Sequence, residues 1–109
     1  MKYQMQKVHE SDITPSFFEG EKGTVEVRDI IDDELNAGIR IVQPDSDVPR
    51  KTHSHPQKQI IYVISGNGQI TNGIETFDFG PGDFVLLDSN EEHYVATGSE
   101  EVKVFEIKY

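Results

Sequence analysis

The sequence predicts an all-β domain, and three observations lead to that prediction. Short runs rich in β-branched and aromatic residues recur at close intervals. Explicit turn sequences separate them, and no helical apolar stripe of any length is present. Many short strands with turn signals between them are typical of a sandwich or barrel. With 109 residues the chain is near the usual size for one hydrophobic core, so we expect a single domain over residues 1–109.

Eight runs along the chain are expected to form strands. They are Thr24–Ile31, Gly38–Gln43, Gln59–Ser65, Gln69–Thr71, Glu75–Phe79, Phe84–Leu87, His93–Thr97 and Val102–Lys108. Before them, Ile13–Phe18 is compatible with a short strand or with a helical turn packed on the barrel. The Gly-Asn-Gly stretch 66–68 and the Asn-Gly pair 72–73 suit tight hairpins, because Asn and Gly tolerate positive φ. The Gly-Pro-Gly-Asp stretch 80–83 is a further strong turn.

Composition narrows the classes of function. Lys and Arg number 10 against 20 Asp and Glu, which gives a formal net charge of −10. Such an acidic surface repels phosphates and anionic lipid, so we expect neither a nucleic-acid nor a membrane partner. Cysteine is absent, which excludes disulfides, thiolate metal sites and a cysteine nucleophile. No apolar run approaches bilayer length and the N-terminus is too polar for a secretory signal, so we expect a cytoplasmic protein.

The stretch HSHPQKQ, residues 53–59, is the most informative for chemistry. Residues two apart in a strand point to the same face, so His53 and His55 are expected to project together. Pro56 interrupts the β-ladder, and Gln59 then opens the next strand. If Gln59 faces inward, the alternate positions 60, 62 and 64 present apolar side chains outward, where another sheet or another subunit is expected to pack.

Two stretches resemble the motifs of the cupin family. HxH at His53 and His55, followed by Gln59 and a glycine-rich turn, is similar to the first cupin motif and covers about residues 49–68. The turn 80–83, with His93 ten residues after its aspartate, is similar to the second motif and covers about residues 80–94. The resemblance implies a double-stranded β-helix, the jelly-roll barrel of the cupin type.

The resemblance also implies one divalent transition metal, held by His53, His55, Gln59 and His93. Imidazole nitrogen suits Mn, Fe, Co, Ni, Cu or Zn, and an amide oxygen is a permissible fourth ligand. Each histidine taken singly is better explained as a polar residue at a strand end, and the set within the two motifs favours the metal. Glutamate is the usual residue at position 59 of this motif, and the neutral Gln59 leaves the full charge on the metal. That favours Lewis-acid chemistry over oxygen chemistry.

The pattern HSHPxxQIxYVxSGxG is particularly similar to the small cupins of pectin degradation, which open unsaturated uronate sugars to linear keto acids. By its distance from the last histidine, Glu106 corresponds to an acidic residue of those proteins, and we take it as the candidate catalytic proton carrier. Lys108 falls where those proteins have an aromatic residue. The resemblance to those proteins therefore extends to the metal ligands more fully than to the residues that bind the substrate.

Three further residues are candidates for substrate binding. Arg40 could clamp a carboxylate, but its flanking residues Ile39 and Ile41 favour an outward orientation in solvent, unless Arg40 and Val42 share the inner side. Gln43, on the opposite face from Arg40, would line the cavity if those isoleucines do, and Tyr94 could offer its phenol. The acidic cluster Asp29, Asp32, Asp33 and Glu34 lacks the spacing of a calcium loop, and a solvated turn is the preferred interpretation.

These observations favour a metal-dependent enzyme acting on a small polar substrate, such as a sugar acid or keto acid. Isomerase, ring-opening or lyase chemistry leads and dioxygenase chemistry follows. The alternative is a non-catalytic cupin that senses a small molecule or metal. A metal-free structural or storage cupin is the least favoured alternative, because such a protein has no need of all four ligand positions. The exposed edges of a small jelly roll and its second apolar face predict a homodimer.

Overall fold

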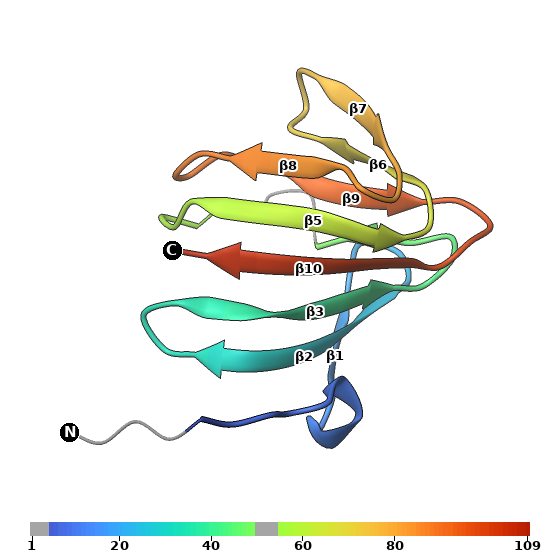
Figure 1. The fold of residues 1–109 in the computed structure, drawn as a ribbon. Coiled ribbons are helices and arrows are strands. Elements are labelled where there is room, and N and C mark those ends of the chain that lie inside the picture. The colour runs from blue at the N-terminus through green and yellow to red at the C-terminus, as the bar shows by residue number, and fades with distance from the viewer. Residues whose placement is uncertain (1–4, 50–54) are drawn as a thin grey trace.

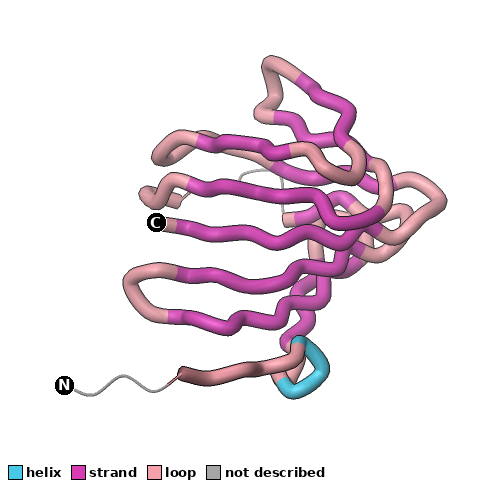
Figure 2. Tube along the Cα trace, viewed as in Figure 1, coloured by secondary structure: helices cyan, strands magenta, loops and turns pink. Residues whose placement is uncertain are grey.

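The computed structural model describes residues 5–49 and 55–109, which form an almost entirely β-stranded fold (Figure 2). A short 3-10 helix, η1, spans Glu10–Asp12. The strands of this part of the chain are β1 (Ser16–Glu19), β2 (Thr24–Asp32), β3 (Asn36–Val42), β4 (Asp47–Val48), β5 (Gln59–Ser65), β6 (Gly68–Thr71), β7 (Thr76–Phe79), β8 (Phe84–Leu87), β9 (Tyr94–Thr97) and β10 (Val102–Lys108). The predicted all-β class is confirmed.

The strands form two antiparallel sheets (Figure 1). The larger sheet has the order β1-β2-β3-β10-β5-β8, and the smaller has the order β4-β9-β6-β7. The last strand, β10, therefore lies between β3 and β5, where it pairs antiparallel with both. This exchange of distant strands is the jelly-roll arrangement, and it brings residues near the C-terminus beside the start of β5.

The hydrophobic core lies between the two sheets, inside the barrel. Its buried members are Val42, Val48, Ile61, Val63, Ile70, Phe79, Leu87, Val102 and Val104, from both sheets. Along β5, Gln59, Ile61 and Val63 are buried while Tyr62 and Ile64 are exposed. Gln59 therefore faces inward, which is the condition on which the alternation along β5 is interpreted.

The structure refines several of the sequence-based boundaries. Each of the eight predicted runs is a strand, and their ends move by two residues at most. Strand β4 was not predicted, because two residues carry no recognisable alternation. The open choice over Ile13–Phe18 ends in a strand at Ser16–Glu19, with the helical turn η1 placed before it.

The two glycine-rich turns differ in what they connect. Asn72 and Gly73 join the paired strands β6 and β7, as predicted for a hairpin. The prediction of a hairpin at 66–68 is wrong, because β5 and β6 belong to different sheets and are not paired. The turn there instead carries the chain from one sheet to the other.

Candidate functional site

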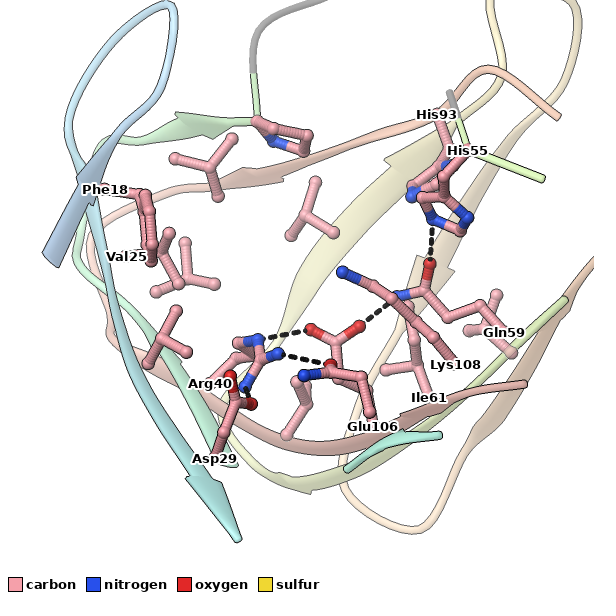
Figure 3. Close-up of a pocket in the computed structure, with 18 of the residues that line it drawn as sticks. Phe18, Val25, Asp29, Arg40, His55, Gln59, Ile61, His93, Glu106 and Lys108 are labelled. Atoms are coloured by element: carbon pink, nitrogen blue, oxygen red, sulfur yellow. Dashed lines mark hydrogen bonds and ion pairs between the residues drawn. The ribbon is translucent and has the colours of Figure 1, made fainter. Parts of the chain in front are cut away.

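A cavity of about 810 Å³ lies inside the barrel and is partly open to solvent. Figure 3 shows side chains that line it. Much of its wall is apolar and belongs to the core, with contributions from Val25, Val27, Val42, Val48, Ile61, Ile70, Phe79, Val85, Val95 and Val104. Polar and charged side chains gather elsewhere on the wall, among them Asp29, Arg40, His55, Gln59, His93, Glu106 and Lys108. The cavity therefore offers a polar set of donors and acceptors beside an apolar surface.

His55 and His93 lie together at the polar end of the cavity (Figure 3). Their ring centroids are 5.3 Å apart, with the rings at 80° to each other. His55 Nδ1 lies 3.0 Å from the carbonyl oxygen of Gln57, and His93 Nδ1 lies 2.9 Å from that of Glu91. A carbonyl can only accept, so each Nδ1 carries the proton. In the neutral rings Nε2 then keeps a lone pair, which is the arrangement that metal-binding histidines use.

Burial favours the neutral form of His93. The residue is buried just before β9, and desolvation lowers the pKa of its ring, while the hydrogen bond to the Glu91 carbonyl acts in the opposite direction. A lowered pKa keeps the imidazole uncharged near neutral pH. The neutral imidazole is the form that coordinates a metal.

Gln59 connects His55 to a buried acid (Figure 3). Its Oε1 lies 2.9 Å from His55 Nε2, and its Nε2 donates a hydrogen bond to Oε2 of Glu106. A carboxylate can only accept hydrogen bonds, so the amide must present its NH₂ group to Glu106 and its oxygen to His55. Gln59 and Glu106 are both buried.

The prediction that Arg40 points outward is wrong. Arg40 is buried and lines the cavity, because Arg40 and Val42 share the inner face of β3. Its Nε lies 2.8 Å from Glu106 Oε1, and its Nη1 lies 2.6 Å from Asp29 Oδ1. Its Nη2 donates to Asn36 Oδ1 at 3.0 Å. Every guanidinium nitrogen is thus engaged with the protein, which leaves little of Arg40 to clamp a substrate.

Asp29 also departs from its expected place. The acidic cluster was interpreted as a solvated turn, but Asp29 lies within β2, faces the cavity and pairs with Arg40. Its alternation with Val27 and Val25, two and four residues earlier, is the signal that could have revealed this.

The remaining predicted residues are not all brought to the cavity. Among the described lining residues, β3 contributes Val42 but not Gln43, whose carbonyl accepts from Thr97 Oγ1 at 2.6 Å. The same lining includes His93 and Val95 but not Tyr94 between them. His53 lies outside the described residues.

Lys108 is a cavity residue that sequence reasoning passed over as a binding group. It lies on the same face of β10 as Glu106, pairs in register with Gln59, and lines the cavity (Figure 3). Its charge is close enough to His93 to contribute to the lowered pKa of that ring. Within the described part of the chain, Lys108 and Arg40 are the cations of the cavity wall.

The donor set fits a transition metal, although it is incomplete in the described residues. Within residues 5–49 and 55–109, no three His, Cys, Asp or Glu side chains form a group that could hold a metal. The described donors are two imidazole nitrogens and one amide oxygen, and His53 would be a further imidazole. Nitrogen and oxygen donors of this kind suit divalent first-row metals.

Comparison with known proteins places this geometry in a family. Residues 38–108 match the Cupin domain family. L-ectoine synthase from Vibrio campbellii is 40% identical over 48 residues, which are 41% of this chain and 38% of that protein. The chain therefore covers well under half of this relative's length.

Solved structures show the same fold. A predicted oxalate decarboxylase from Thermotoga maritima has a TM-score of 0.83 and 23% identity, over 94% of this chain and 97% of that one. The polyketide cyclase RemF from Streptomyces resistomycificus has a TM-score of 0.81 and 23% identity, over 96% of this chain and 79% of that one.

Within the described residues, no helix has the length and apolar character needed to cross a membrane.

Proposed function

This chain belongs to the cupin domain family, and on that premise we propose that it is a metal-dependent enzyme acting on a small polar substrate. The proposed ligands are His53, His55, Gln59 and His93, and the metal is a divalent transition ion. Bound there, such a metal supplies a Lewis acid that polarises oxygen atoms of a substrate.

One observation carries the metal proposal, and it is a matter of donors and acceptors. His55 Nδ1–H donates a hydrogen bond to the Gln57 carbonyl, and the NH₂ group of Gln59 donates one to Glu106. When the ring is neutral, its Nε2 and the amide Oε1 are both acceptors, and these two atoms lie 2.9 Å apart. Two lone pairs at that distance require a proton or a cation to share. A divalent cation is the partner that an imidazole nitrogen and an amide oxygen would both bind.

We propose that the substrate is a small anion, such as a sugar acid or keto acid, and that one cation attracts it on a wall that also carries the carboxylates of Glu19, Asp32 and Asp33. Arg40 is committed to Asp29, Asn36 and Glu106, so it contributes little attraction for an incoming anion. Lys108 is the other cation of the described wall, and we propose that it attracts the substrate carboxylate. The apolar wall would exclude water from the carbon skeleton.

For the reaction we propose isomerase, ring-opening or lyase chemistry first and dioxygenase chemistry second. The comparisons support an enzyme, since the similar proteins are a synthase, a predicted decarboxylase and a cyclase. Their differing names do not select one substrate. A proton-carrying role of Glu106 and a cytoplasmic location both stay predictions.

Elemental analysis of the purified, tag-free protein tests the metal. We expect near one metal ion per chain in the wild type and none in the folded double variant His53→Ala/His93→Ala. His9→Ala is the matched control, because His9 is an exposed histidine at the N-cap of η1 and should leave the metal content unchanged. A wild-type protein that is empty, and that takes up none of Mn, Fe, Co, Ni, Cu or Zn, would overturn the proposal.

The same metal-loaded protein separates an enzyme from a sensor. A panel of sugar acids and keto acids is incubated with wild type and with Gln59→Ala, and the products are followed by NMR. Turnover by wild type and its loss in Gln59→Ala support the enzyme. Tight binding without turnover of any compound supports the alternative, a cupin that senses a small molecule.

A further inference from the structure

We propose that Glu106, held by Arg40, fixes the orientation of the Gln59 side chain, and that position 59 consequently requires an amide and disfavours a carboxylate. The proposal rests on the proposed function where it concerns the metal. Its structural half concerns the metal-free protein and stands without it.

Behind Gln59, a chain of contacts runs through Glu106 and Arg40 to Asp29. Glu106 presents two oxygens, of which Oε1 lies 2.8 Å from Arg40 Nε and Oε2 accepts from the Gln59 amide. Arg40 is held in turn by Asp29, at 2.6 Å. All of Gln59, Glu106 and Arg40 are less than 10% exposed, so water screens these contacts little. The carboxylate therefore has a fixed place and a fixed preference for N–H donors.

The Glu106 carboxylate determines which end of the Gln59 amide faces it. An amide has one end that donates and one that accepts, and in isolation the two ends fit similar space. Turning the side chain over would set its oxygen against Glu106 and its NH₂ group against His55. Glu106 rejects that arrangement, since two acceptors would then face each other in a buried site. Glu106 is thus a positioning residue that keeps the amide oxygen toward the proposed metal.

The charges of Arg40, Asp29 and Glu106 also act on the Gln59 amide. Arg40 carries one positive charge, and Asp29 and Glu106 carry one negative charge each, so the group has an excess of one negative charge behind the amide. A carboxylate that accepts a hydrogen bond from the NH₂ group polarises the amide. The amide oxygen then becomes a stronger ligand for a cation. A glutamate at position 59 would instead place two carboxylates in contact inside the protein, where their repulsion is strong.

The exchange of the two residues provides the test. In Gln59→Glu/Glu106→Gln, the new amide at 106 can accept from Arg40 with its oxygen and donate to the new carboxylate at 59. The exchange keeps the composition and the net charge of the site. The two single variants each break the match, so the proposal predicts strong non-additivity between positions 59 and 106.

The experiment measures thermal unfolding of chelator-treated protein and, separately, Zn²⁺ or Mn²⁺ binding by calorimetry, for wild type, both single variants and the exchange. We expect Gln59→Glu to lower Tm by roughly 5 °C or more and the exchange to recover at least half of that loss. We expect Glu106→Gln to weaken metal binding by about tenfold or more. Glu21→Gln, at an exposed turn residue, controls for the loss of one negative charge.

Each outcome decides a separate question. Additive changes in the Tm of the metal-free protein would overturn the positioning role, whatever the metal does. Non-additive changes, with no metal bound by wild type, would keep the positioning role and remove the proposed function. If Gln59→Glu does not fold, the exchange still decides, because folded protein supports the proposal and unfolded protein contradicts it. A role of Glu106 in carrying protons alone would move neither readout.

Discussion

Glu100 shows how a single exposed carboxylate can hold a connection in place. Its Oε1 accepts from the backbone N–H of Asn67 at 2.6 Å and from the side-chain Nδ2 of the same residue at 2.8 Å. These two hydrogen bonds stabilise the charged form and lower the pKa of Glu100. Asn67 lies in the turn that carries the chain from β5 to β6, so the carboxylate steadies a passage between the two sheets.

The lowered pKa of Glu100 leads to a prediction about pH. Because the folded pKa lies below the ordinary value of 4.5, the stabilisation is fully present above that value and is lost as the pH falls through the folded pKa. Glu100→Gln should therefore lower the free energy of unfolding at pH 7, and the difference from wild type should shrink below about pH 4.5. Urea unfolding at a series of pH values measures it. A difference that stays constant into the acid range would contradict the prediction.

The contrast between Gln59 and Arg40 shows what sequence can predict of single residues. The sequence predicts that Gln59 shares a face with Ile61 and Val63, which are apolar and close in sequence, and all three are buried. For Arg40, the neighbours Ile39 and Ile41 predict an outward orientation, because they suggest that the apolar face is the inner one. An arginine is buried only with partners, and its partner Glu106 lies on the distant strand β10. No local pattern contains that information.

At the scale of elements, the strands were predictable and their partners were not. Alternation and turn residues are local, so the ends of the predicted runs are off by two residues at most. The pairing of β10 with both β3 and β5 depends on how the whole chain is wound. The turn at 66–68 has the composition of a hairpin, yet it crosses between sheets, because its neighbours find better partners elsewhere.

Gly66 and Gly73 allow a direct comparison of these two connections. Both have positive φ, at 85° and 91°. A Cβ on Gly66 would collide with the carbonyl oxygen of Glu101, whereas a Cβ on Gly73 meets nothing within 4 Å. We expect Gly73→Ala to cost about 1–2 kcal/mol in unfolding free energy, the cost of the left-handed backbone, and Gly66→Ala to cost more. Urea unfolding of both variants measures this. Equal losses would show that the crossing is not tightly packed.

At the scale of the whole molecule, the outer face of the larger sheet carries an apolar surface. The apolar surface consists of Tyr62, Ile64, Phe84 and Leu86, which are 36%, 42%, 67% and 74% exposed. They lie on the adjacent strands β5 and β8, and the rings of Tyr62 and Phe84 are 4.7 Å apart. Strand β8 is also an edge of its sheet. Exposed apolar residues at a sheet edge are typical of a surface that another chain covers.

We propose that a second copy of the chain covers this apolar surface, which gives physical form to the predicted homodimer. Size-exclusion chromatography with light scattering should then report about twice the 12.3 kDa mass of the chain. Leu86→Glu should shift the protein to the monomer, since a buried, unpaired charge at the interface is costly. Ile74→Glu, at a residue 92% exposed in the β6–β7 turn, removes an apolar side chain away from the surface and should leave the dimer intact. A wild-type protein that elutes as a clean monomer at working concentrations would contradict the proposal, and the exposed rings would then need another partner.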